Sequence, residues 1–337
     1  MTVDIIAPME AKLVAALPED GGWQFEPKWD GFRAIMYRDG DRVEILSKSG
    51  KTLARYFPEL VEVLMATPTK RYTLDGEVIL PVGGILSFDA LQQRLHPAAS
   101  RITRLSKETP AQMMLFDCLT LEAERLLDRP LDDRRAALER FHQRDGGPSI
   151  MLSPASNDHA TAAAWLAGSG GALDGVIAKR IDQPYRHGER AMLKVKVHHS
   201  ADCVVAGLRR AADGGAIASL LLGLYDDAGK LNHVGFTSGI KAGDLAALEK
   251  RVRPYLGGAG FSGKSPGGPS RWNNGRESEW EPLDPQLVVE VAFDQVTGGR
   301  FRHGTRILRW RPDKAPAQCT MEQLVQEVRP VELAALA

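Results

Sequence analysis

The chain has 337 residues, 43% of them hydrophobic and 26% charged, a composition typical of a soluble globular protein with about two domains. Basic and acidic residues both number 43, which excludes a generally basic protein, so any nucleic-acid contact must come from a local patch. Three cysteines without a CxxC pair exclude a disulfide scaffold and favour a reducing compartment. Without a signal peptide or a long apolar run, we expect a cytoplasmic protein that does not enter a membrane.

The first quarter of the chain predicts an antiparallel sheet with helices beside it. Apolar and polar residues alternate in several short segments, as in half-buried strands. Asp39-Gly40, between two of these segments, is a strong hairpin signal. In chain order, we expect a short helix at residues 9–17, strands at 23–28, 32–37 and 42–46, a helix at 57–65 and a strand at 73–80.

Lys28 lies among aromatic residues at the end of one of these strands. Lysine is a poor nucleophile at neutral pH unless burial or a nearby cation lowers its pKa. Trp29 and Phe32 could supply the burial and Arg33 the cation, while Gly31 would let the backbone turn beside a bulky ligand. The alternative is an exposed lysine on a strand that ends in an Asp-Gly turn, because short motifs often match by chance.

Later strands carry charged residues within apolar sequence, which is costly unless the charges are paired or bind an ion. Glu77 either binds a cation or forms a salt bridge across the sheet. Asp174 and Lys179 lie on another such strand. On a third, alternation puts Lys194 and Lys196 on one face, where they would repel each other unless an anion lies between them. An exposed edge strand protected by lysines is the other explanation.

The middle of the chain combines a basic run with further helices and strands. Arg94 lies at the end of a predicted helix, and Arg101 and Arg104 follow it. Such a basic run is either a solvated face or a track for phosphates. Phe116 is either a core residue or a platform on which a base stacks. The expected elements are helices at residues 88–95 and 132–142 and strands at 113–117, 173–179 and 192–197.

Beyond residue 199 the pattern changes to short strands and one helix, which predicts a small β-barrel such as an OB-fold. Residues 258–265 match the P-loop pattern, but they follow a helix and precede a Pro-Gly stretch, so we expect a surface loop. A final arginine-rich cluster, with Arg311 and Lys314 near its end, favours phosphate ligands. Strands are expected at residues 204–207, 218–225, 233–236 and 287–293, and a helix at 244–256.

Taken in order, these segments form a recognisable series. Lys28-Trp29-Asp30-Gly31-Phe32-Arg33 resembles the KxDGxR nucleophile motif of covalent nucleotidyltransferases, and Arg311-Pro312-Asp313-Lys314 resembles their closing RxDK element. Segments 75–77, 115–117, 174–179 and 194–196 follow in that family's order. The chain is similar to small two-domain bacterial ATP-dependent DNA ligases of the C type, over nearly its whole length. This implies an α+β fold, with an antiparallel-sheet adenylation domain at residues 1–199 and an OB-fold domain at 200–337.

The resemblance also implies a role for each motif residue. Lys28 would attack the α-phosphate of ATP and carry AMP to the 5′-phosphate of a DNA nick, which the 3′-hydroxyl then seals. Glu26 would select adenine and Phe116 stack on it, while Arg33 and Lys48 would contact the ribose or the nick phosphate. Magnesium, or manganese in its place, would be held by Glu77 and Asp174. The other nucleotide-binding residues would be Glu77, Lys179, Lys194, Lys196, Arg311 and Lys314, and Arg94, Arg101 and Arg104 would grip DNA.

The chain departs from the family pattern at two positions. Asp174 stands where the family usually has glutamate, so its carboxylate is retracted by about one methylene. Lys48 stands where many relatives have arginine, so a bidentate contact would be lost. The expected protein is a monomer of the nucleoid that works on nicked duplex DNA, beside other DNA-repair proteins. An RNA ligase, an mRNA-capping enzyme and a non-catalytic nucleic-acid-binding protein are the alternatives.

Overall fold

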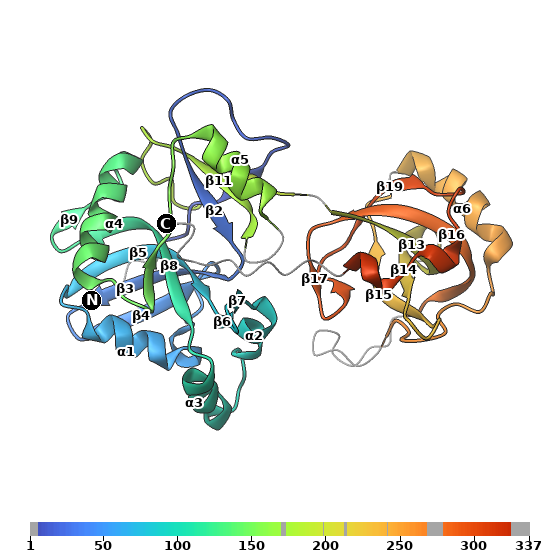
Figure 1. Ribbon diagram of the computed structural model, residues 1–337, viewed down its shortest axis with the longest axis horizontal. Coiled ribbons are helices and arrows are strands. Elements are labelled where there is room, and N and C mark those ends of the chain that lie inside the picture. The colour runs from blue at the N-terminus through green and yellow to red at the C-terminus, as the bar shows by residue number, and fades with distance from the viewer. Residues whose placement is uncertain are drawn as a thin grey trace. The chain divides into compact units, whose positions relative to one another are not determined.

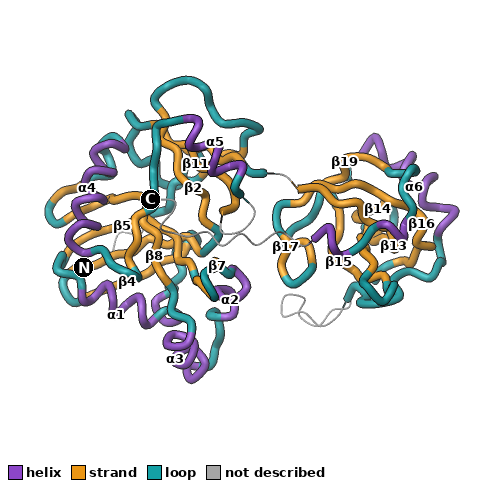
Figure 2. The backbone as a smooth tube through the Cα atoms, viewed as in Figure 1, coloured by secondary structure: helices purple, strands orange, loops and turns teal. Residues whose placement is uncertain are grey.

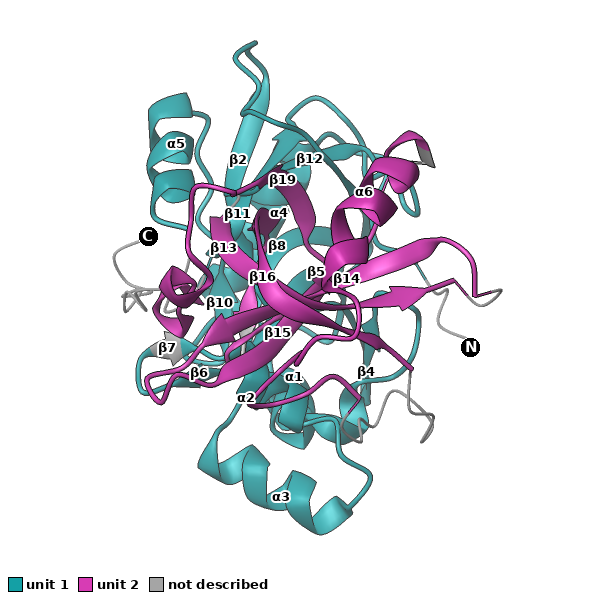
Figure 3. Ribbon diagram, turned by 90° about the vertical axis from the view of Figure 1, so that its right-hand side faces the viewer, with its two compact units in different colours: residues 1–197, 327–337 teal, residues 198–326 magenta. Residues whose placement is uncertain are grey.

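The computed structural model describes residues 6–169, 173–197, 199–211, 214–240, 242–267 and 279–324. The chain divides into two compact units, residues 1–197 with 327–337 and residues 198–326, which Figure 3 shows in different colours. This division lies beside the boundary expected between residues 199 and 200. Both units are built mainly from strands (Figure 2). No helix in the described part of the chain is long and apolar enough to cross a membrane.

The first unit contains a four-stranded sheet in the order β1-β12-β11-β2, a larger one in the order β10-β8-β5-β3-β4 with β9 beside β8, and a small pair of strands, β6 with β7 (Figure 1). Most neighbouring strands are antiparallel, except β1 with β12 and β10 with β8. The strands are β1 (Ala11–Leu13), β2 (Trp23–Trp29), β3 (Phe32–Asp39), β4 (Arg42–Ser47), β5 (Arg71–Ile79), β6 (Pro81–Val82), β7 (Ile85–Leu86), β8 (Gln112–Leu121), β9 (Glu124–Arg125), β10 (Ile150–Leu152), β11 (Leu173–Arg180) and β12 (Met192–Val195).

Helices cover the outer faces of both sheets. The core of the larger sheet joins strand residues such as Leu74 and Leu115 to Leu60 and Phe141 of two helices, α1 and α4. Against the smaller sheet, α5 contributes Ala162 to a cluster that contains Phe25 (Figure 1). The helices are α1 (Pro58–Ala66), α2 (Phe88–Gln93), α3 (Ala99–Glu108), α4 (Leu131–Asp145) and α5 (His159–Ala167).

Two local predictions in the first unit have opposite outcomes. The hairpin at Asp39-Gly40 is confirmed, because β3 pairs with β4 up to Asp39 and Arg42, and Gly40 has a φ of 60°. The helix expected at residues 9–17 is wrong. Within this segment, Ala11–Leu13 instead form β1, which pairs in parallel with β12. The strand forms despite the local helix propensity because it gives hydrogen-bond partners to backbone groups of β12, which would otherwise be an unpaired edge of the sheet.

The second unit is organised around a five-stranded antiparallel sheet in the order β15-β14-β13-β16-β19 (Figure 1). Its core consists mainly of leucine and valine from β13, β14 and β16, with Leu248 and Val252 from α6. Residues 258–265 lie in a loop, as expected. The elements are β13 (His199–Arg210), β14 (Ile217–Tyr225), β15 (Leu231–Thr237), α6 (Leu245–Val252), β16 (Glu281–Phe293), β17 (Val296–Thr297), β18 (Arg300–Phe301) and β19 (Arg306–Trp310).

Candidate active site

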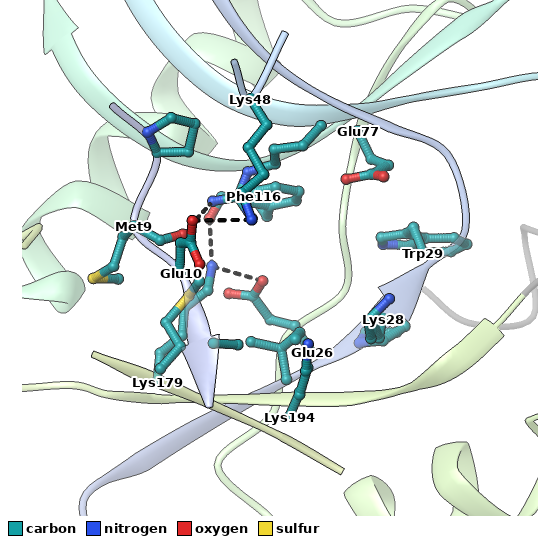
Figure 4. A pocket seen from close by; sticks show the side chains of 16 residues that line it. Met9, Glu10, Glu26, Lys28, Trp29, Lys48, Glu77, Phe116, Lys179 and Lys194 are labelled. Atoms are coloured by element: carbon teal, nitrogen blue, oxygen red, sulfur yellow. Dashed lines mark hydrogen bonds and ion pairs between the residues drawn. The ribbon is translucent and has the colours of Figure 1, made fainter. Parts of the chain in front are cut away.

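A pocket of about 210 Å³ in the first unit collects most of the residues that the motifs single out. Strands of both sheets contribute to it, and Figure 4 shows their side chains converging on one space. Five of the lining residues are cationic and three are acidic, so the pocket suits a polyanion. It is lined by Pro8, Met9, Glu10, Ala11, Glu26, Pro27, Lys28, Trp29, Arg33, Lys48, Glu77, Phe116, Ile177, Lys179, Met192 and Lys194.

Lys28 is held by a carboxylate from the neighbouring strand. Its Nζ lies 2.5 Å from Oδ2 of Asp174, and the Nζ of Lys196 lies 2.9 Å from the same oxygen. Burial opposes ionisation of Asp174, but the charges and hydrogen bonds of Lys28 and Lys196 outweigh it and hold the pKa of Asp174 below its usual value. Asp174 is thus the shared counter-ion of two lysines, and it fixes the position of the Lys28 amine.

Glu26 lies almost fully buried at the inner end of the pocket. Its two oxygens are both occupied, one by the Nε2 of Gln24 at 2.7 Å and the other by the Nζ of Lys179 at 2.8 Å. Lys179 also donates to the carbonyl of Phe116 at 3.2 Å and lies over the Phe116 ring at 4.7 Å. These contacts link the strands that carry Glu26, Phe116 and Lys179 on one side of the pocket. Gln24 had not been singled out from the sequence, because a lone glutamine in a strand carries no signal.

Arg33 is fixed by a buried network behind the pocket. Its guanidinium makes two hydrogen bonds of 2.6 Å to Asp75 and lies 4.5 Å over the Phe116 ring. The hydroxyl of Tyr185 donates to Asp75 at 2.5 Å and accepts from the backbone N–H of Met9 at 2.9 Å. Asp75 belongs to a motif that the sequence analysis quoted, whereas Tyr185, 110 residues away in the chain, could be placed there only by the fold.

Glu77 and Lys194 complete the charged lining of the pocket. Burial raises the pKa of Glu77 to about 7, although Arg33 and Lys28 act in the opposite direction. Burial also lowers the pKa of Lys194, with the positive charges of Lys28 and Lys196 adding to the effect. A bound cation would therefore favour the ionised form of Glu77, and a bound anion would favour the charged form of Lys194.

The mouth of the pocket carries an ion pair between Lys48 and Glu10, whose Nζ and Oε1 lie 2.9 Å apart. Arg190 approaches the other oxygen of Glu10 at 3.5 Å. The Lys48 side chain is 61% exposed, so it can move toward a ligand at little cost. Glu10 was missed from the sequence because it lies in the segment that was expected to be helical.

Arg311 and Lys314 lie in the second unit, where Asp202 holds both. The Nη1 of Arg311 donates to the two oxygens of Asp202 at 2.9 and 3.0 Å, and the Nζ of Lys314 lies 2.7 Å from Oδ2. Arg311 also binds Asp313 at 2.8 Å. Asp202 was not singled out from the sequence.

The three arginines expected to grip DNA differ in exposure. Arg94 has 0% of its side chain exposed, pairs with Glu59 at 2.7 Å and donates to two backbone carbonyls, so its expected DNA contact is wrong. Arg94 instead links α1, through Glu59, to the segment that follows α3, through the carbonyl of Thr109. Arg101 and Arg104 both lie on α3, where Arg101 is partly buried and Arg104 is 62% exposed. Their DNA contacts stay a prediction.

The carboxylates of the pocket fit magnesium in part. Mg²⁺ is usually held by one or two carboxylates together with substrate phosphates. Glu77 lines the pocket and can supply one such ligand, while Asp174 would first have to release at least one lysine. The described residues contain no cluster of three or more metal-binding side chains, so most of the coordination would come from phosphate and water.

Comparisons with known proteins decide the family. The family described as "ATP dependent DNA ligase domain" matches residues 8–196, and "ATP dependent DNA ligase C terminal region" matches residues 213–314. DNA ligase C1 of Mycolicibacterium smegmatis is 45% identical over 330 residues, covering 95% of this chain and 93% of that protein. The chain belongs to the ATP-dependent DNA ligase family. This confirms the predicted resemblance.

Further relatives agree with this assignment. DNA ligase C of Mycobacterium tuberculosis is 42% identical to this ligase over 336 residues, covering 95% of this chain and 93% of that protein. A solved Lig E DNA ligase has 18% identity and a TM-score of 0.55, and the match covers 91% of this chain and 100% of that one. The predicted α+β nucleotidyltransferase unit followed by an OB-fold unit is therefore confirmed for this ligase.

Proposed function

We propose that this ligase seals nicks in duplex DNA through an AMP bound to Lys28. The single observation that carries the assignment of the nucleophile is the position of the Lys28 amine, which projects into a polyanion-binding pocket and is held there by Asp174. Lys28 would attack the α-phosphate of ATP, forming an N–P bond as the bond to pyrophosphate breaks. The amine proton must leave for this attack, and Asp174 is the adjacent acceptor.

The remaining pocket residues have roles that follow from their contacts. Glu26 would accept a hydrogen bond from the amino group of adenine if Gln24 or Lys179 gave way, and Phe116 would stack on the base. Lys194 and Lys196 would offset the charge that builds on the α-phosphate. Arg33 and Lys48 would bind the ribose or the nick phosphate.

The later steps would transfer AMP from the lysine to the 5′-phosphate of the nick and then release it when the 3′-hydroxyl attacks. Magnesium, held by Glu77, by Asp174 and by the phosphates, would supply Lewis-acid stabilisation of the reacting phosphate. Arg311 and Lys314 would orient pyrophosphate in the first step. A DNA-repair role at the nucleoid, with repair proteins as further partners and the ligase acting as a monomer, completes the proposal.

The test is the mass of the purified protein after incubation with ATP and magnesium. We expect wild-type ligase to gain one AMP and Lys28→Ala to gain none, because Lys28 both lines the pocket and is held by Asp174, whereas Lys196 shares Asp174 but does not line the pocket. Lys70→Ala, which removes an exposed lysine of the same unit, is the matched control and should gain AMP normally. AMP on the Lys28→Ala variant would refute the assignment. Incubation with GTP in place of ATP distinguishes a capping enzyme.

A further inference from the structure

Two arginines of the second unit, Arg209 and Arg300, lie near each other and near His233. Arg300 on β18 donates from Nη2 to Nδ1 of His233 on β15 at 2.9 Å. Arg209 on β13 lies near enough for its charge to act on both Arg300 and His233. Within the described chain, neither arginine pairs with a carboxylate, and the buried Nε of Arg209 has no hydrogen-bond partner.

Other arginines of this unit are neutralised, which makes this pair unusual. Arg210, next to Arg209 in the chain, lies 3.2 Å from Glu249 and 2.7 Å from Glu281. Arg309 and Arg311 also contact carboxylates, at 2.6 Å from Glu290 and 2.9 Å from Asp202. The unit thus has acids available for its cations, yet among its described residues none pairs with Arg209 or Arg300.

His233 orients one of the arginines without adding an ionisable group that is charged at pH 7. The imidazole is 5% exposed and packs edge-on against Phe261, with ring centroids 5.3 Å apart. Burial and then the charges of Arg300 and Arg209 lower the pKa of His233 to about 4, so the ring is neutral at pH 7 and accepts the hydrogen bond from Arg300. Burial and Arg300 likewise lower the pKa of Arg209. Two like charges in partly buried surroundings repel each other unless an anion binds between them.

We propose that Arg209 and Arg300 together bind one backbone phosphate of the DNA duplex, with His233 as the residue that positions Arg300. Guanidinium groups suit phosphate oxygens because each can donate two hydrogen bonds. Arg300 is exposed and Arg209 is partly buried, so one side chain can reach out to the phosphate while the other closes behind it. The inference rests on the proposed function, since it takes nicked duplex DNA as the substrate.

The test measures binding of a nicked duplex that ends in a 3′-dideoxynucleotide and cannot be sealed, from 50 to 200 mM salt. Arg209→Gln and Arg300→Gln should each weaken binding by about tenfold, the effect expected for a charged hydrogen bond of about 1.4 kcal/mol. Because both residues hold the same phosphate, the double variant should lower the slope of log affinity against log salt by about one rather than about two. Unchanged affinity and slope in the double variant would overturn the proposal.

Two control variants remove the same charge elsewhere. Arg210→Gln changes the adjacent, neutralised arginine, and Arg125→Gln breaks an exposed pair with Asp128 in the first unit. Both should bind the duplex like the wild type, and thermal melting checks that every variant is folded. Equal weakening by the controls would show a general charge effect and overturn the proposal.

The rate of lysyl-AMP formation, measured on the same variants, separates DNA from ATP as the source of the phosphate. It should stay within about twofold of wild type in Arg209→Gln and Arg300→Gln if the bound phosphate belongs to DNA. Slower lysyl-AMP formation together with unchanged DNA binding would assign the site to the phosphates of ATP and overturn the proposal. If the wild type itself forms no lysyl-AMP, the proposed function fails, while the DNA-binding measurements still report on this site.

Discussion

At the scale of single residues, the pocket shows how a shorter acid can hold the lysine that we propose as the nucleophile. Asp174 stands where the family usually has glutamate, and its carboxylate lies 2.5 Å from Lys28 and 2.9 Å from Lys196. Both lysines approach the same oxygen, so the ammonium charges are offset by one group. This geometry favours a role for Asp174 as a counter-ion before ATP binds. Asp174 could contact a metal ion only after one of the two lysines had moved away from it.

Glu77 gives a prediction about pH and stability. Its pKa rises from 4.5 to about 7 on folding because the carboxylate is buried, so the folded state binds the proton more tightly. Stability should therefore fall as pH rises from about 4.5 to about 7. The Glu77→Gln variant lacks this pH-dependent loss. The difference between its free energy of unfolding and that of the wild type should therefore grow over that pH range, by no more than about 3 kcal/mol. Unfolding transitions measured between pH 5 and 8 check this.

The control for Glu77 is Glu62→Gln, which removes an exposed acid from α1. It should show a much smaller change of relative stability with pH. A difference between Glu77→Gln and wild type that stays constant from pH 5 to 8 would contradict the prediction, because it would mean that Glu77 titrates alike in both states.

At the scale of elements, the turn between β2 and β3 places Lys28 and Arg33 on the same pocket. This turn passes so close to β5 that a Cβ on Gly31 would lie 2.2 Å from the carbonyl oxygen of Val78 and 2.8 Å from Cγ of Glu77. A backbone oxygen in a paired strand cannot move aside easily. The glycine is therefore required by close packing, and the left-handed φ that often explains a turn glycine is not involved.

Gly31→Ala should consequently destabilise the first unit and disturb the pocket. Overpacking of this kind costs roughly 1–3 kcal/mol, which lowers Tm by roughly 2–12 °C for a unit of about 200 residues. Lysyl-AMP formation should also slow, because the strands that carry Lys28 and Glu77 must separate. Gly21→Ala is the control, since a Cβ there meets no atom within 4 Å. Equal melting temperatures and rates for the two variants would show that the strands adjust freely.

At the scale of the whole molecule, the two units carry different parts of the proposed chemistry. The first unit holds the proposed nucleotide pocket, whereas Arg311 and Lys314 belong to the second and are bound there by Asp202. If these cations serve only the departure of pyrophosphate, they matter in the first step and not after AMP has reached DNA. The phosphate site at Arg209 and Arg300 should matter in the later steps.

Arg311→Ala tests this division. We expect lysyl-AMP formation to fall by about a hundredfold or more, while a pre-adenylated nick is still sealed at nearly the wild-type rate. Lys314 remains beside Asp202 in this variant, so the carboxylate is not left unpaired and the unit should fold. Single-turnover rates of the two steps are the measurement, with Arg300→Gln as the variant expected to show the opposite pattern. Equal losses in both steps would mean that Arg311 is a general DNA contact.

Sequence patterns predicted many strands and helices correctly and failed where long-range contacts decide the structure. The strand around Glu77 and the hairpin at Asp39-Gly40 follow from local alternation and turn chemistry, and both are present. Helices α3 and α5 were not predicted, because one is a highly charged segment and the other an alanine-rich one without a clear apolar stripe. The roles of individual site residues, and the halves at 1–199 and 200–337 as functional domains, stay predictions.

The order and chemistry of the motifs belong to the sequence alone, because a lysine, a carboxylate or an arginine has the same functional groups in any fold. They sufficed to indicate a covalent nucleotidyltransferase. Only the tertiary structure decided which charges meet. Asp174 reaches Lys28 across 146 residues of chain, and Arg94 is buried against Glu59 although its local sequence predicts a solvated, basic surface. Strand pairing and helix packing set these distances, and the pKa and availability of each charged group depend on its neighbours in space.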